Sequence, residues 1–165
     1  MIAEVLKRSF ILVLFCLVQI MVLNRIHLFN CATPLLYVYF AIIFPRSYPK
    51  WAIMLWCFAM GLVVDAFSNT PGVASASMTL VGALQPVFLE LFLPRDADEK
   101  IKVSAAALGV SKFSTLSLIL TFIFCLVFFA LESFSFFNWL YWLECVVGST
   151  LLTLILIFTL ECFRK

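Results

Sequence analysis

The side chains most able to do chemistry in this chain are carboxylates set in apolar surroundings. Asp65 lies about one turn before a break at residues 69–72, and Glu144 lies near the start of another apolar stretch. A carboxylate in hydrocarbon costs roughly 2.5 to 3.5 kcal/mol, so it should face protein or water and have a partner. Asp65 can cap the following turn through the amides of Phe67 or Ser68, or help to bind a partner or a small ligand. An intramembrane acid–base enzyme would require the two carboxyls to converge.

The cysteines and the single histidine do not form a pattern typical of a metal or redox site. The six cysteines contain no Cys-x-x-Cys pair, and His27 has no ligand neighbour at metal-site spacing. Most of the cysteines lie in apolar runs, where a thiol behaves as a small hydrophobe. No phosphate-cradling glycine motif is present either. We therefore expect no enzymatic activity, no metal and no cofactor.

The composition indicates an integral membrane protein. The chain has 165 residues, of which 65% are hydrophobic and 12% charged, and its mean hydropathy is +1.15. Soluble domains carry about 25% charged residues. The net charge of +2 is too small to indicate a nucleic-acid partner. We expect a single polytopic membrane domain over residues 1–165.

Apolar stretches predict an all-α bundle of about six transmembrane helices. They cover residues 9–28, 34–44, 51–67, 73–93, 113–131 and 139–161. Because about 20 residues cross a bilayer, the stretch at 51–67 is marginal and the one at 34–44 is short enough to be re-entrant instead. The first stretch is expected to be an uncleaved helix, since its apolar run is long for a signal peptide and no A-x-A-like site follows.

The basic residues favour six crossings. With six, ten of the eleven lysines and arginines share one face, and only Arg25 lies on the other. By the positive-inside rule both termini are then cytoplasmic. Without the second crossing the split is 9 to 2 in the opposite orientation, which leaves Lys7 and Arg8 outside beside the first helix. We therefore prefer six crossings.

The stretch at 73–93 carries a face of small residues. Ser75, Thr79 and Gly82 share that face, because spacings of four and three return to the same side of a helix. Small residues let membrane helices approach closely, so this face predicts core packing or, alternatively, a subunit interface. Pro86 removes a backbone donor and should kink the helix, exposing carbonyls near Gln85.

Two charged segments complete the pattern. Residues 94–102 form the most hydrophilic segment and predict either a solvated loop or a docking site for a cytoplasmic partner. Glu161 lies three and four residues before Arg164 and Lys165, a spacing that predicts an ion pair at the end of the last helix.

The run of residues 61–73 resembles the signature of MreD, the rod shape-determining membrane protein family of bacteria. That signature has Gly-x-x-x-Asp, a gap of six residues and a second Gly, matched here by Gly61, Asp65 and Gly72, with Pro71 and Pro86 in the same block. The overall size, the short second stretch, the charged loop and the basic C-terminus fit the family as well. The chain departs from it at two positions, where Ala74 replaces a usual His or Asn and Gln85 replaces a basic residue.

The resemblance implies a non-catalytic membrane scaffold subunit of the cell-elongation complex, or elongasome, which makes peptidoglycan and sets cell shape. It further implies the bacterial inner membrane as location. The implied partners are an MreC-like bitopic protein and, directly or indirectly, the actin-like MreB filament, the RodA glycosyltransferase and its transpeptidase. Residues carried over or packed beside them are the candidate partner-binding set: Gly61, Asp65, Pro71, Gly72, Ser75, Thr79, Gly82 and Pro86. On this hypothesis, replacing Asp65 with Ala weakens the complex with the bitopic partner without lowering membrane levels of the protein.

A transport component is the alternative. The MreD family is similar in expected fold to the substrate-binding subunits of energy-coupling-factor vitamin transporters, which are also small six-helix proteins. Here five aromatic and acidic residues could converge on the outer side to line a ligand pocket: Trp139, Tyr141, Trp142, Asp65 and Glu144. Co-purification of a vitamin, or thermal stabilisation by one, would favour this alternative.

Overall fold

The chain forms an all-α bundle, as the sequence predicts. The computed structural model describes residues 2–21, 33–93, 103–133 and 139–163, and within these ranges there is no β-strand. The long helices are α1 (Ile2–Met21), α3 (Lys50–Ser68), α4 (Val73–Phe92), α6 (Val110–Ser133) and α7 (Trp139–Phe163). Two short helices, α2 (Val38–Ile42) and α5 (Ala105–Leu108), lie between them.

Four helices of the described part, α3, α4, α6 and α7, are long and apolar enough to cross a membrane. This is the pattern of a multi-pass membrane protein. Helix α1 is as long as α4 but carries Glu4, Lys7 and Arg8 in its first half. Residues 22–28 of the predicted first crossing, like the charged segment 94–102, lie outside the described residues.

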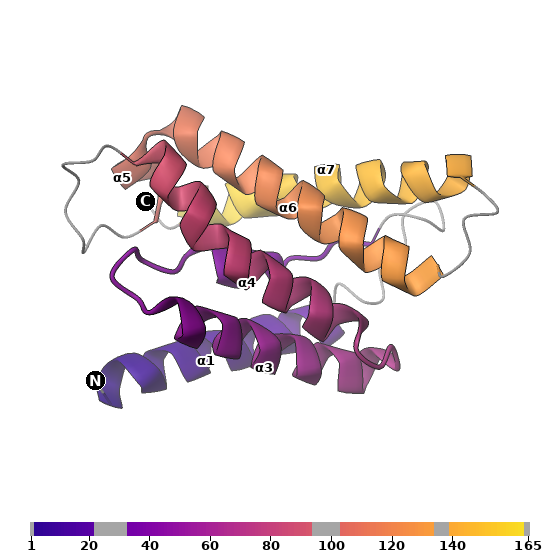
Figure 1. Ribbon diagram of the computed structural model, residues 1–165, viewed down its shortest axis with the longest axis horizontal. Coiled ribbons are helices and arrows are strands. Elements are labelled where there is room, and N and C mark those ends of the chain that lie inside the picture. The colour runs from indigo at the N-terminus through magenta and orange to yellow at the C-terminus, as the bar shows by residue number, and fades with distance from the viewer. Residues whose placement is uncertain (1, 22–32, 94–102, 134–138, 164–165) are drawn as a thin grey trace.

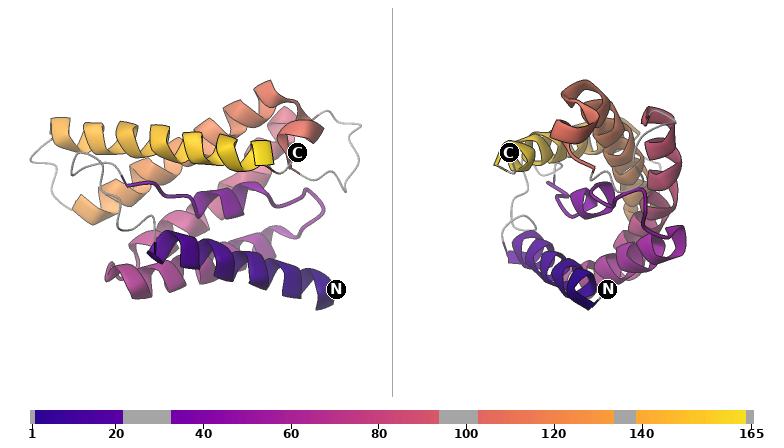
Figure 2. Two further views of the ribbon diagram at one scale, coloured as in Figure 1. Left: turned by 180° about the vertical axis from the view of Figure 1, so that it is seen from behind. Right: turned by 90° about the vertical axis from the view of Figure 1, so that its left-hand side faces the viewer.

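The long helices surround α2. Viewed end-on, α1, α3, α4, α6 and α7 follow one another around the bundle, with α2 inside (Figure 2, right). Neighbours in this ring are also the packed pairs, α1 with α3, α3 with α4, α4 with α6 and α6 with α7. Helices α3 and α6 end, and α4 and α7 begin, at one end of the bundle, which we call the pocket end (Figure 1). Helix α1 begins and α7 ends at the opposite end, which we call the basic end (Figures 1 and 2).

The second predicted crossing is not a transmembrane helix. A helix was expected over residues 34–44, but α2 has only five residues, about 8 Å of helix against about 30 Å of hydrocarbon. Residues 33–49, which we call the central segment, still pass from the pocket end to the basic end through the middle of the bundle (Figure 1). Every side chain from 34 to 42 is buried. Irregular backbone is tolerated at membrane depth only where protein surrounds it, and the ring of long helices supplies that surrounding.

Two side-chain hydroxyls of α7 accept hydrogen bonds from backbone amides of the residues that precede α2. The Thr33 amide donates to Ser149 Oγ at 3.1 Å, and the Leu35 amide donates to Thr153 Oγ1 at 3.0 Å. Both hydroxyl residues are fully buried. Because an unpaired buried amide is costly, these two side chains compensate for the missing helix.

Two glutamine side chains also form hydrogen bonds with backbone groups of this segment, one before and one after α2. The Gln19 side chain of α1 donates through Nε2 to the Pro34 carbonyl at 2.9 Å and accepts from the Leu36 amide at 3.1 Å. After α2, Gln85 of α4 donates through Nε2 to the Phe44 carbonyl at 3.1 Å. Polar residues of α1, α4 and α7 thus hold the central segment from three directions.

Candidate functional site

Asp65 lies in the last turn of α3, and its side chain caps the start of α4. Its side chain is buried, with 5% of its surface exposed. Oδ1 accepts from the Ala74 amide at 2.8 Å and from the Thr70 hydroxyl at 3.2 Å, and Oδ2 accepts from the Ser75 amide at 2.9 Å. The first amides of a helix have no intrahelical acceptor, and the helix dipole favours a negative charge there. The buried carboxylate is therefore stabilised by the helix that follows it.

The capping predicted from the sequence is correct in kind but wrong in its partners. The expected amides were those of Phe67 and Ser68, whereas the observed ones lie beyond the turn at residues 69–72. Asn69 and Gly72 have positive φ angles of 59° and 89°, which reverse the chain so that the start of α4 returns to α3. Asn and Gly are the residues that adopt this left-handed conformation at least cost.

Gly61 lets the backbones of the two helices touch. It lies one turn before Asp65 on the same face of α3. A Cβ at this glycine would lie 2.3 Å from Cα of Ser75 and 2.8 Å from the carbonyl oxygen of Ala74, so no side chain fits. Further along, a Cβ at Gly82 would lie 2.9 Å from the Cys57 sulfur. We call the contact of Gly61 and Asp65 with the turn and first residues of α4 the α3–α4 corner.

The other predicted partner-binding residues differ in how far they are buried. Thr79 is half-buried, and its hydroxyl donates to the Ser75 carbonyl at 2.6 Å. Pro86 is buried inside α4, which continues past it to Phe92. Pro71 and Gly72 are exposed at the tip of the corner. The small-residue face of α4 therefore packs largely in the core. The part of the corner that is accessible from outside is its tip, Pro71 and Gly72.

The two carboxylates singled out from the sequence have different environments. Asp65 is buried against α4, whereas Glu144 lies on the exposed side of α7. Glu161, also on α7, is buried and accepts a hydrogen bond of 2.6 Å from the Tyr39 hydroxyl. An ion pair was predicted there with residues 164 and 165, which lie outside the described residues. The hydrogen bond from Tyr39 ties Glu161, and with it α7, to the central segment.

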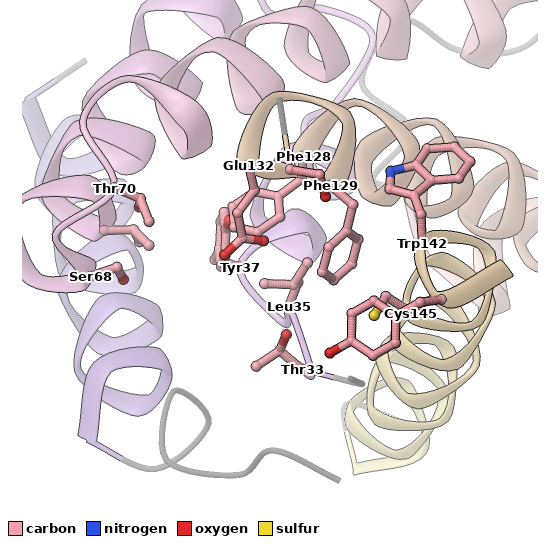
Figure 3. Close-up of a pocket in the computed structure, with 13 residues that line it drawn as sticks. Thr33, Leu35, Tyr37, Ser68, Thr70, Phe128, Phe129, Glu132, Trp142 and Cys145 are labelled. Atoms are coloured by element: carbon pink, nitrogen blue, oxygen red, sulfur yellow. The ribbon is translucent and has the colours of Figure 1, made fainter. Parts of the chain in front are cut away.

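A pocket of about 450 Å³ opens at the pocket end, beside the corner (Figure 3). The ends of α3 and α6, the start of α7 and residues 33–37 contribute to its lining. Tyr141 and Trp142, two of the five residues predicted to line an outer pocket, do line it. Trp139, Asp65 and Glu144 are not among its lining residues.

The sequence reasoning missed the residues that give this pocket its character. Three aromatic side chains from the core line it, Tyr37, Phe128 and Phe129, together with the carboxylate of Glu132. Ser68 and Thr70 face these residues from the α3 side (Figure 3). Glu132 is a charged residue at the end of an apolar stretch, a signal that was available, but nothing in the sequence showed that residues 37 and 132 meet.

Buried thiols follow the expectation for small apolar side chains. Cys16, Cys57, Cys125 and Cys145 are buried, whereas Cys162 is exposed. Within the described part of the chain, no group of three or more His, Cys, Asp or Glu side chains could hold a metal ion.

The fold and the corner define an all-helical, multi-pass membrane protein built around a broken central segment. In comparisons with protein-family models, curated proteins and solved structures, nothing matches this chain. The similarity to MreD and the expected likeness to vitamin-transporter subunits therefore stay predictions from the sequence.

Proposed function

We propose that this chain is a non-catalytic membrane scaffold subunit of the bacterial cell-elongation complex, as an MreD-like protein would be. Its direct partner would be the single membrane helix of an MreC-like bitopic protein. The MreB filament, the RodA glycosyltransferase and its transpeptidase would join directly or through that partner. The proposal rests on the sequence signature, and the geometry of the α3–α4 corner supports it.

The observation that carries the proposal is that the signature residues meet at one place. Gly61 and Asp65, four residues apart, lie on one face of α3 and both contact the first turn of α4. The six residues between Asp65 and Gly72 span the chain reversal. The spacing of the signature therefore has a physical reason, which is to fix a tight corner at the pocket end.

This geometry changes the role expected of Asp65. Its carboxylate is buried and already accepts three hydrogen bonds, so it holds the corner in shape instead of contacting a partner directly. Pro71 and Gly72, exposed at the tip of the corner, and the exposed Phe67 beside it are the residues that a partner helix would contact. A partner complex would then depend on Asp65 through the stability of the corner.

We also propose the inner membrane, with the basic end in the cytoplasm. The described basic residues before α3 and at the starts of α1, α3 and α6 all belong to the basic end, where α1 begins (Figure 1). They are Lys7, Arg8, Arg46, Lys50 and Lys112. This bias fits the positive-inside rule with both termini cytoplasmic. The basic residues lie at one end because residues 33–49 cross the bundle between α1 and α3 (Figure 1).

Site-specific photo-cross-linking in living bacteria tests the scaffold proposal. A benzophenone amino acid at Phe67, which is 67% exposed at the corner, is compared with one at Leu151, which is 58% exposed on α7. The cross-linked products are identified by mass spectrometry. An MreC-like protein captured from position 67 and not from position 151 supports the proposal.

Two results would contradict it. Equal capture of the MreC-like protein from both positions would remove the corner as the contact. Recovery of a transporter coupling subunit and its ATPases, in place of elongation proteins, would favour the transport alternative.

A further inference from the structure

The pocket beside the corner has the size and construction of a ligand site. Its volume of about 450 Å³ lies within the range of small-molecule pockets. It opens at an end of the bundle, where lipid headgroups and water meet a membrane protein. The pocket shares Thr70 with the corner, but Phe67, Pro71 and Gly72, the residues proposed to contact the partner helix, are not among its lining residues.

Aromatic side chains and one carboxylate dominate the lining. The aromatic residues are Tyr37, Phe128, Phe129, Tyr141 and Trp142, and the carboxylate is that of Glu132 (Figure 3). Among the thirteen described residues that line the pocket there is no Lys, Arg or His. Among the described lining residues the one formal charge is therefore negative, and a cation would meet a carboxylate and the negative faces of aromatic rings.

A buried hydroxyl in the lining lacks a partner. Tyr37 is fully buried, and its hydroxyl has no hydrogen-bond partner among the described residues. Its ring is fixed by an edge-on contact with Phe124, with ring centroids 5.3 Å apart. Buried polar groups are nearly always hydrogen-bonded. A ligand group that reaches the bottom of the pocket would supply the missing partner.

We propose that this pocket binds a primary ammonium group. The ammonium would pair with the Glu132 carboxylate, donate to the Tyr37 hydroxyl oxygen, and lie against the aromatic rings of α6 and α7. Three N–H donors on one compact cation match a carboxylate and a hydroxyl acceptor, which an anion or a neutral apolar molecule does not. Two sources can supply such an ammonium, a free organic amine or the headgroup of an aminophospholipid such as phosphatidylethanolamine.

The test uses the full chain purified in detergent and two kinds of probe. Ethanolamine and phenethylamine report on free amines by thermal shift and calorimetry, and their uncharged analogues ethylene glycol and phenethyl alcohol serve as references. Native mass spectrometry compares retention of phosphatidylethanolamine with that of phosphatidylglycerol. Binding of a free amine, or selective retention of the aminophospholipid, supports the ammonium site and identifies its source.

Matched variants test whether the ammonium binds in this pocket. Glu132→Gln and Glu144→Gln each remove one exposed carboxylate near the same end of the bundle, but only Glu132 lines the pocket. Glu132→Gln should weaken ammonium binding at least tenfold, and Tyr37→Phe about threefold or more, while Glu144→Gln leaves it unchanged. The proposal is overturned if neither probe is preferred over its reference, or if Glu132→Gln and Tyr37→Phe both bind as wild type does. Neither result would bear on the photo-cross-linking test of the scaffold.

Discussion

Replacing Asp65 with alanine is expected to destabilise the protein by about 2 to 6 kcal/mol. The change removes the acceptor for the Ala74 and Ser75 amides, both of which lie in buried surroundings. Each buried donor left without a partner costs about 1 to 3 kcal/mol, and two such donors give the stated range. An exposed helix cap costs only about 0.5 to 2 kcal/mol when lost, because water replaces the acceptor there.

The free energy of unfolding can be measured by titrating the purified protein in mixed micelles with SDS, with tryptophan fluorescence as the signal. Asp65→Asn should cost about half as much as Asp65→Ala, because the amide oxygen of Asn can still accept from one of the two backbone amides. Glu144→Ala is the control, since it removes a carboxylate that is exposed on α7. That variant should remain within about 0.5 kcal/mol of wild type, as is usual for surface substitutions.

A wild-type unfolding free energy for Asp65→Ala would refute the capping argument. It would mean that water or another group satisfies the α4 amides when the carboxylate is absent. The prediction from the sequence, a weakened partner complex at unchanged membrane levels of the protein, would then be the better account of Asp65.

Two further substitutions test other contacts in the same assay. Gly61→Val places a Cβ 2.3 Å from a backbone atom of α4, so the helices must separate at a cost of about 1 to 3 kcal/mol or more. The control Ala66→Val adds similar bulk on the exposed side of α3 and should be nearly neutral. Equal destabilisation by the two substitutions would contradict the close contact at Gly61. Thr153→Val leaves the Leu35 amide without its acceptor and should cost about 1 to 3 kcal/mol. Thr159→Val, which removes an exposed hydroxyl from the same helix, should cost less than about 0.5 kcal/mol, and a cost as large as that of Thr153→Val would argue against support of the central segment by α7.

Several features of the fold were predictable because they follow from composition and local pattern. The all-α class, the long apolar helices and the turn at residues 69–72 come from hydropathy and from the Asn and Gly that permit positive φ. The contact face of Ser75 and Gly82 follows from helical spacing. These are properties of short stretches of chain, so they can be read without knowing which helices are neighbours.

The central segment could not be predicted correctly, because its conformation depends on other parts of the chain. Residues 34–44 are apolar enough for a short helix, yet only 38–42 are helical. The rest is irregular because Gln19, Gln85 and two hydroxyls of α7 supply its hydrogen bonds from far along the sequence. Each of these polar residues was visible in an apolar helix, but its partner was not.

For the corner and the pocket, too, some features were predictable from the sequence and others were not. The pattern of residues was enough to predict that Gly61 and Asp65 share a face of one helix and that a tight turn follows, since both depend on residue types and spacing alone. The packing of the helices was needed to show that the Asp65 carboxylate caps α4 and that Tyr37 and Glu132 line one pocket. The physical reason is that a hydrogen bond or a pocket requires groups to meet in space, and that meeting is set by how whole helices pack.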